Sequence, residues 1–117
     1  MREICFYRTE SGREPVREFL DSLQPKQAQR VTWVLSLVEE LRVVPRQYFK
    51  KLESTEDIWE VRVQSGGNAY RLLGFWDGPQ FVVLCHGLTK KTQQLPRREI
   101  RTAEERKNDY FRRKGRK

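Results

Sequence analysis

The stretch from Ile58 to Lys91 most constrains how this chain can fold, because it contains three runs in which apolar and polar residues alternate. Two glycine-bearing turns separate the runs, one at Gly66-Gly67 and the other at Gly78-Pro79. Glycine tolerates the positive φ angles of tight hairpin loops, and alternating residues are typical of strands. The stretch therefore predicts a three-stranded antiparallel meander.

The two turns also predict how the strands pair. If Gly66-Gly67 is a two-residue loop, Arg62 lies directly opposite Arg71 on the next strand. If Gly78-Pro79 is the tip of the second turn, Arg71 lies opposite His86. One row across the sheet then contains Arg62, Arg71 and His86. A slip of one residue would move the whole set to the other face.

The same register divides the side chains between two faces of the sheet. We expect a core face made of Trp59, Val61, Val63, Tyr70, Leu72, Trp76, Phe81, Val83 and Cys85. The opposite, mixed face contains Glu60, Arg62, Ala69, Arg71, Leu73, Phe75, Val82, Leu84, His86 and Leu88. Facing arginines destabilise a sheet. They indicate either an anion site or, if Glu60 neutralises part of the charge, a solvated sheet face.

The residues before the meander predict one strand and two helices. Residues 3–8 alternate enough for a short strand. Pro15 begins a short pattern of apolar residues at helical spacing, and a longer pattern runs from Pro25 to just before Pro45. We expect these two helices to form a hairpin over the sheet, and residues 48–52 to form a connector.

The segment after Pro96 predicts a final helix that is mostly charged. Its apolar stripe is narrow and consists of Ile100, Ala103 and Tyr110. We therefore expect weak docking and exposed arginines at positions 98, 101, 106 and 113. The element order β-α-α-β-β-β-α predicts a single α+β domain over residues 1–113, followed by a basic tail over residues 114–117.

The charge of the chain is unevenly distributed. The formal net charge is +8 over 117 residues, and residues 90–117 hold 12 basic and 4 acidic side chains, which accounts for the whole excess. A basic stripe confined to one segment is typical of a protein that binds a polyanion. The last six residues can also be interpreted as a solvated tail.

Several classes of protein do not fit this sequence. No apolar run approaches the ~20 residues of a membrane span, and the N-terminus lacks the apolar core of a signal peptide. We therefore expect a cytoplasmic protein with no membrane partner. Cys5 and Cys85 lie in apolar strand patterns without metal-type spacing, which predicts buried free thiols and no metal site. We expect no cofactor.

Motifs along the second half of the chain resemble the RelE/HigB/ParE toxin superfamily, and most closely its phage-type HigB-like branch. They are the strands Trp59–Val63 and Tyr70-Arg71-Leu72, the segment Cys85–Thr92 at the end of the third strand, and the helix residues Pro96, Ile100, Ala103 and Asp109-Tyr110. The resemblance implies a type II toxin. Such a toxin is an endoribonuclease that cleaves mRNA, usually in the ribosomal A site, and that a cognate antitoxin silences.

The resemblance also implies site residues. Arg71 matches the family's arginine that follows an aromatic residue. Arg62 matches the family's basic residue on the first meander strand, and Lys91 matches its basic residue just beyond the third meander strand. His86 falls where the branch often has a histidine, so these four are the candidate catalytic residues. Glu60 stands where RelE has a lysine. The candidate RNA-binding residues are Lys50, Lys51, Glu60, Lys90, Arg98, Arg101 and Tyr110.

These residue types can support RNA cleavage without a metal. The reaction needs a base for the 2′-hydroxyl proton, an acid for the leaving oxygen, and cations around the phosphorane. Arg62 and Arg71 can supply the cations. His86 is the only histidine, the residue type whose unperturbed pKa lies near neutrality, so it is a candidate base, with Glu60 as its competitor. Lys90 or Lys91 can hold the leaving group or the RNA backbone.

Two other functions are compatible with the sequence. The same fold in the ParE branch inhibits DNA gyrase by binding it. The chain could also be a non-catalytic nucleic-acid-binding regulatory module. If the chain is a ribonuclease toxin, we expect Arg71 to face the surface and to hold the phosphate, so that its replacement by alanine removes toxicity while barely changing stability.

Overall fold

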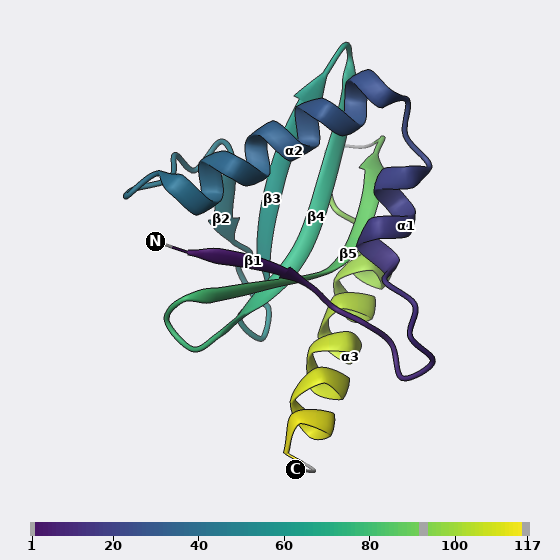
Figure 1. The fold of residues 1–117 in the computed structure, drawn as a ribbon, viewed down its shortest axis with the longest axis vertical. Helices are drawn as coiled ribbons and strands as arrows, with labels where there is room; N and C mark the ends of the chain where they lie inside the picture. The colour runs from purple at the N-terminus through teal and green to yellow at the C-terminus, as the bar shows by residue number, and fades with distance from the viewer. Residues whose placement is uncertain (1, 92–93, 116–117) are drawn as a thin grey trace.

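The computed structural model of the protein describes residues 2–91 and 94–115, and shows one α+β domain (Figure 1). A mixed sheet has the strand order β1-β5-β4-β3-β2, in which β1 runs parallel to β5 and the other neighbours are antiparallel. The elements in chain order are β1 (Glu3–Phe6), α1 (Pro15–Asp21), α2 (Pro25–Glu40), β2 (Phe49–Lys51), β3 (Trp59–Ser65), β4 (Asn68–Asp77), β5 (Phe81–Lys90) and α3 (Arg97–Lys114). The predicted fold class, meander and three helices are confirmed.

Prolines mark the start of each helix, as the sequence predicted. Pro15 and Pro25 are the first residues of α1 and α2, and Pro96 directly precedes α3. A first helical position needs no backbone N–H, and the fixed φ of proline suits it. No helix in the described part of the chain is long and apolar enough to cross a membrane.

Strand β2 is the element that the sequence analysis missed, since residues 48–52 were expected to form a connector. Its backbone pairs with β3: the N–H of Arg62 donates to the carbonyl of Tyr48, and the N–H of Leu52 donates to the carbonyl of Ile58, both at 2.8 Å. The side chain of Phe49 is buried against Trp59, with ring centroids 4.9 Å apart. A strand of three residues is too short for its alternation to be visible in the sequence.

The first hairpin has the predicted register. Arg62 lies opposite Arg71, and Ser65 lies opposite Asn68. Gly66 and Gly67 form the loop with φ angles of 53° and 84°. Both angles are positive, as a two-residue loop matched to strand twist requires.

The predicted register of the second hairpin is wrong. Arg71 lies opposite Leu88, and His86 lies opposite Leu73. Two extra residues cause the difference. The loop between Asp77 and Phe81 contains three residues instead of two, and a β-bulge follows, at which Leu73 pairs with His86 but Gly74 pairs with Leu84. His86 therefore lies one row of pairs away from Arg71 on β4, and not beside it.

The longer loop reverses the predicted faces of β5 before the bulge, and the bulge restores the predicted face from His86 onward. Val82 and Leu84, expected on the mixed face, belong to the core between the sheet and the helices α1 and α2. Val83 and Cys85, expected in that core, belong to a second core on the other face of the sheet. Phe81 is exposed. The cysteines are free, as predicted, but only Cys85 is fully buried.

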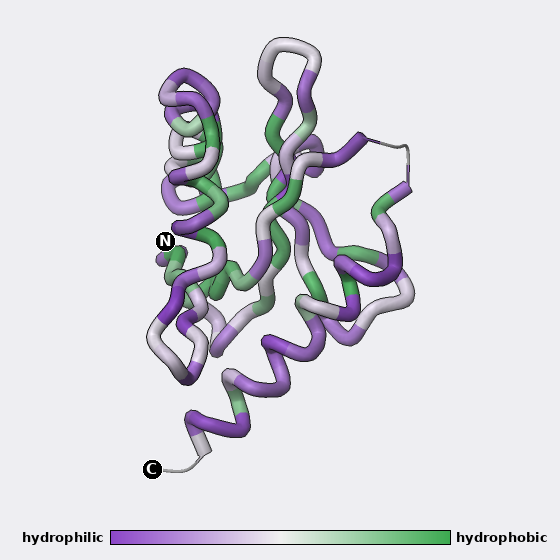
Figure 2. Tube along the Cα trace, turned by 90° about the vertical axis from the view of Figure 1, so that its right-hand side faces the viewer, coloured by the Kyte–Doolittle hydropathy of each residue, from purple (hydrophilic) through white to green (hydrophobic). Residues whose placement is uncertain are grey.

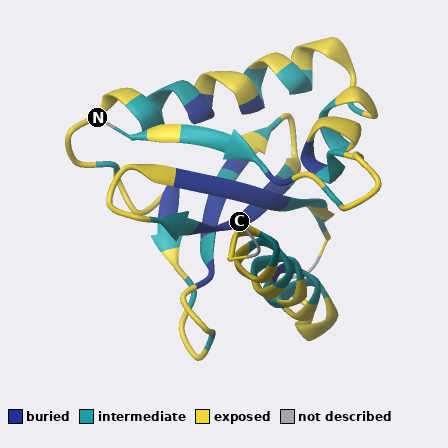
Figure 3. Ribbon diagram, turned by 60° about the horizontal axis from the view of Figure 1, so that its bottom comes forward, coloured by how far each residue is buried: buried dark blue, intermediate teal, exposed yellow. Residues whose placement is uncertain are grey.

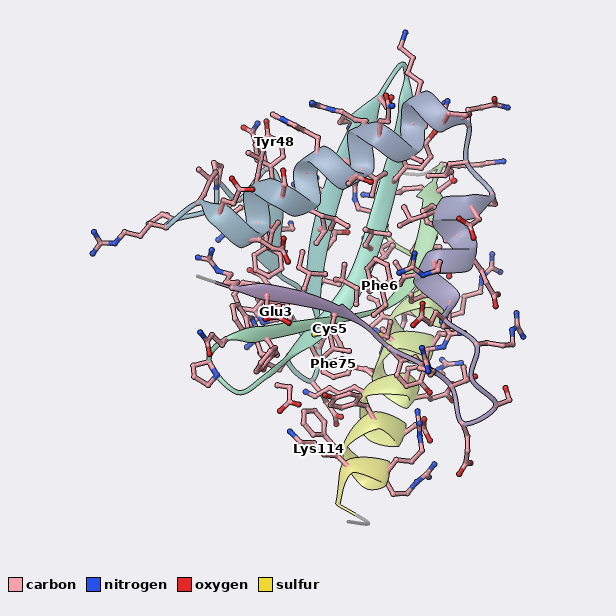
Figure 4. All side chains as sticks on the ribbon, in the orientation of Figure 1. Glu3, Cys5, Phe6, Tyr48, Phe75 and Lys114 are labelled. Atoms are coloured by element: carbon pink, nitrogen blue, oxygen red, sulfur yellow. The ribbon has the colours of Figure 1, made fainter. Side chains whose placement is uncertain are left out.

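Two helical layers therefore cover the sheet (Figure 2). The helices α1 and α2 lie on one face, over a core that includes Val31, Val34 and Val38 from α2. α3 lies on the other face, over Leu73, Phe75 and Ala103. Buried residues are concentrated in the central strands and on the faces of the helices that point toward the sheet (Figure 3). Phe75 lies beside α3 (Figure 4).

α3 has the narrow apolar stripe that the sequence predicts, since Ala103 is its only fully buried residue. Its docking depends on hydrogen bonds that were not predicted. The hydroxyl of Tyr110 donates to Asp77 at 2.6 Å, and the hydroxyl of Tyr7 donates to Asp109 at 2.5 Å. Arg106 and Arg113, expected to be exposed, donate to the carbonyls of Cys85 and Arg8.

The end of α3 crosses the predicted boundary between domain and tail. The helix continues to Lys114, whose ammonium group donates to both carboxylate oxygens of Asp77 at 2.7 Å. Lys114 therefore belongs to the folded domain. Residues 116–117 of the predicted tail lie outside the described residues.

Candidate anion-binding site

The sheet face that α3 partly covers carries charged side chains in three neighbouring rows. The pairing places Lys50, Glu60, Leu73 and His86 in one row, Arg62, Arg71 and Leu88 in the next, and Gln64, Ala69 and Lys90 in the third. We refer to Lys50, Arg62, Arg71 and Lys90 as the cation cluster. These four side chains come from β2, β3, β4 and β5, so the sheet itself brings together residues distant in the sequence.

Glu60 lies between the two facing arginines of this cluster. Its Oε1 is 3.4 Å from Nε of Arg62, and its Oε2 is 3.2 Å from Nε of Arg71. The carboxylate thereby offsets the repulsion that the Arg62 and Arg71 pair would otherwise cause. This is the partial neutralisation that the sequence analysis considered, but the face is not simply solvated, because the side chains of Glu60 and Arg71 are each only 4% exposed.

The burial of Arg71 corrects the expectation that it faces the surface. Its Nη1 donates to the carbonyl of Tyr70 at 3.2 Å. Its Nε, like that of Arg62, has no hydrogen-bond partner among the described residues, because the nearby Glu60 oxygens do not meet hydrogen-bond geometry. Its Nε is thus ion-paired with Glu60 without a well-aligned hydrogen bond, and a buried guanidinium whose donors are not all satisfied favours an incoming anion.

The electrostatics of the cation cluster also favour the binding of an anion. Burial lowers the pKa of Arg71 below its ordinary value, and Glu60 opposes this effect. Burial also lowers the pKa of Lys90, and the charges of Arg71, Arg62 and Lys50 lower it further. Four cations crowd around one carboxylate. A phosphate bound here would relieve the repulsion among them.

His86 is held by α3 in a separate arrangement. Its Nε2 lies 2.5 Å from Oε1 of Glu99, and its Nδ1 lies 3.2 Å from Nη1 of Arg106. Because a guanidinium only donates, Nδ1 must be the acceptor in the neutral ring. The proton is therefore on Nε2, which donates to Glu99. This hydrogen bond lowers the pKa of Glu99 below its ordinary value.

The surroundings of His86 also differ from those of Arg71. His86 lines a cavity of about 320 Å³ between α1, α3 and the end of β5. The other lining residues are Thr9, Arg13, Pro15, Glu18, Phe19, Gly87 and Arg106. Neither Arg62 nor Arg71 lines this cavity. His86 thus contributes to the contact between the sheet and the helices, whereas Arg62 and Arg71 lie in the neighbouring row of the same sheet face.

The other predicted site residues are distributed around the cluster. Lys50 and Lys90 belong to it, and Lys91 follows Lys90 as an exposed residue. Lys51 pairs with Trp59, which places it on the opposite face of the sheet from Lys50. Its ammonium group is 4.0 Å from Asp57.

The residues predicted on α3 lie further away. Arg98 has an 82% exposed side chain 3.3 Å from Glu99, and Arg101 is exposed beside Glu104 and Glu53. Tyr110 donates to Asp77, which is six residues from Arg71 along β4 and thus ~20 Å away. The structure therefore does not bring Arg98, Arg101 or Tyr110 into the cation cluster.

Glu99 and Arg106 are the polar partners that the sequence analysis missed. A signal for them was present. Glu99 and Arg106 are seven residues apart from each other, and they share one helical face with Ala103, the only buried residue of α3. Charged residues on a face that is otherwise turned toward the core indicate a partner on the sheet. The described residues contain no group of three His, Cys, Asp or Glu side chains that could hold a metal ion.

Comparisons with known proteins identify a family. The model of the family described as phage-derived protein Gp49-like (DUF891) matches residues 18–108. This match spans α2, the whole meander and most of α3, and so includes the cation cluster. No curated protein matches the chain. The chain belongs to the Gp49-like family, which is part of the RelE/HigB-like toxin superfamily.

Proposed function

We propose that this protein is the toxin of a type II toxin-antitoxin system from the phage-type HigB-like branch. In this proposal it acts in the cytoplasm as an endoribonuclease that cleaves mRNA in association with the ribosome, and it needs no metal. A cognate antitoxin neutralises it. The observation that carries the proposal is the buried Arg71, which is ion-paired with Glu60 and lies among three further cations in the part of the chain that the family matches.

Arg71 and Arg62 would hold the scissile phosphate. A buried guanidinium binds an anion more strongly than an exposed one, because water does not compete. Both arginines are held in place by the sheet and by Glu60, so little reorganisation is needed when the negative charge of the phosphorane develops. Lys50 would bind the RNA backbone at the edge of the site.

Glu60 is the proton acceptor closest to that phosphate site, since its two oxygens lie within 3.4 Å of the two arginines. His86 is less suited to this role as the structure stands, because Arg106 occupies its Nδ1 and Glu99 accepts from its Nε2. Lys90 would protonate the leaving 5′-oxygen. Its pKa is lowered by burial and by neighbouring cations, which makes an ammonium group a better acid.

Expression of the protein with and without its antitoxin tests this proposal. We expect growth arrest that the product of an adjacent open reading frame relieves, together with cleavage of mRNA. Arrest with intact transcripts and induction of DNA-damage responses would show gyrase inhibition instead. Normal growth with no change in mRNA would leave only a non-catalytic role. Arg17→Ala, which removes an exposed arginine of α1 on the opposite side of the sheet, is a matched control for Arg71→Ala.

A further inference from the structure

Trp33 is the most exposed aromatic residue in the described part of the chain, with 45% of its surface accessible. It lies on α2, which packs against the sheet through Val31, Val34 and Val38. The other two tryptophans, Trp59 and Trp76, pack against the core. A large ring that does not contribute to the core adds little to folding, so its position calls for another explanation.

Two neighbours hold the Trp33 ring in place. The guanidinium of Arg30 lies 4.5 Å from the ring centroid, in the geometry of a cation–π contact. The ring of Tyr48 meets it edge to face, with centroids 6.1 Å apart and an angle of 86°. Tyr48 lies beside α2, just before β2 (Figure 4). We refer to Arg30, Trp33 and Tyr48 as the Trp33 platform.

The Trp33 platform is adjacent to the cation cluster along the edge of β3. The carbonyl of Tyr48 accepts the backbone N–H of Arg62, and Nε of Arg30 donates to the carbonyl of Gln64 at 3.2 Å. β2 pairs with β3 only as far as Val61, so beyond this point β3 has no neighbouring strand on the side away from β4. An extended ligand that is bound at Arg62 and continues across this edge of the sheet would reach Arg30 and Trp33 next.

The charge of the platform favours a polyanion. Lys26 and Arg30 are the charged residues in the first part of α2, and its two acidic residues, Glu39 and Glu40, lie at the far end of the helix. Proteins that bind single-stranded nucleic acids combine such cationic tracks with exposed aromatic rings on which bases stack. Resting on the function proposed above, we propose that the Trp33 platform stacks a base of the single-stranded RNA whose phosphate the cation cluster holds.

Binding of an uncleavable RNA tests this inference separately from catalysis. The probe is a single-stranded 2′-O-methyl oligonucleotide of mixed sequence, which lacks the attacking hydroxyl, and a second oligonucleotide has the same backbone without bases. We expect the first to quench the fluorescence of the wild-type protein. Trp33→Ala should weaken its binding about tenfold, and Trp33→Phe should restore most of the affinity. The baseless oligonucleotide should bind both proteins equally.

The salt dependence of binding supplies a second criterion. Trp33→Ala should leave the slope of log K against log salt unchanged, because stacking releases no counterions, whereas Arg71→Ala should reduce the slope. Phe81→Ala, which removes another exposed aromatic ring, should have no effect. The inference is overturned if Trp33→Ala binds the oligonucleotide like the wild type while Arg71→Ala does not, a result that spares the proposed function. A wild-type protein that binds neither oligonucleotide overturns both.

Discussion

Glu60 and Arg71 form a buried ion pair between neighbouring strands, with Oε2 and Nε 3.2 Å apart and each side chain only 4% exposed. They are not directly opposite each other, since Glu60 pairs with Leu73 and Arg71 with Arg62. The contact is therefore diagonal. The same carboxylate also approaches Arg62, so one acidic residue makes it possible for two arginines to face each other inside the sheet.

This ion pair predicts that Arg71 contributes to stability as well as to function. Removing Arg71 leaves the buried Glu60 with only its 3.4 Å contact to Arg62, and Arg71→Ala should lower the free energy of unfolding by about 3 kcal/mol. Urea denaturation measures this loss. The double variant Glu60→Gln/Arg71→Ala should recover part of it, because no buried carboxylate remains and the side chain of Arg62 is 34% exposed. Equal losses in the single and double variants would contradict the coupling.

Glu60→Gln tests the role of the carboxylate in catalysis. The amide keeps the shape of the side chain but cannot accept a proton, so we expect the cleavage rate to fall about 100-fold while the protein still binds RNA. His86→Gln is the comparison. Single-turnover cleavage measures both variants. A rate that falls with His86→Gln and remains normal with Glu60→Gln would assign the base to His86.

The tautomer of His86 is a direct prediction of its contacts. Arg106 can only donate to Nδ1, so the neutral ring should carry its proton on Nε2. Nitrogen chemical shifts measured by NMR distinguish the two tautomers of the single histidine. In the double variant Glu99→Ala/Arg106→Ala both constraints are removed, and a mixture should appear. A proton on Nδ1 in the wild-type protein would contradict the assignment of this contact.

The docking of α3 should weaken in acid. Hydrogen bonds from Arg113, and then from Tyr7, lower the pKa of Asp109 from 3.8 to about 2. A depressed carboxyl pKa contributes stability that is fully present above its ordinary value and is lost as the pH falls through the folded value. Stability should therefore decline between about pH 4 and pH 2.

Asp109→Asn is the control for this pH dependence. It should reduce the change in unfolding free energy between pH 4 and pH 2, although Asp77, whose pKa is also lowered by Lys114 and Tyr110, should still contribute. Denaturation at a series of pH values measures the difference. An identical decline in Asp109→Asn and wild type would show that Asp109 is not the group responsible.

The parts of the fold that the sequence predicted well depend on local signals. Two consecutive glycines with positive φ angles determine the first hairpin, and prolines mark the helix starts. The second hairpin was mispredicted because Gly78-Pro79 does not reveal a third loop residue, Gln80. The bulge depends on Gly74, where a Cβ atom would lie 2.2 Å from the carbonyl oxygen of Val83.

The candidate site likewise has features that follow from local sequence signals and features that depend on contacts between distant segments. The Arg62 and Arg71 pair follows from one local turn, and it was predicted correctly. Its burial and the position of His86 depend on contacts between distant segments. Glu99 and Arg106 reach His86 only because α3 docks on β5, and that docking uses hydrogen bonds to residues such as Tyr7 and Asp77. Such contacts leave no periodic pattern in a sequence.

Mapping the 5′ ends of cellular mRNA tests the central claim most directly, if wild-type protein is compared with Arg71→Lys. The lysine keeps a positive charge beside Glu60 but lacks the guanidinium fork, so the variant should fold, as its unfolding curve would verify. We predict new 5′ ends within translated regions on expression of the wild type, and a loss of most of them with Arg71→Lys. New ends that are equally abundant with the folded Arg71→Lys variant, or absent with the wild type, would contradict the claim.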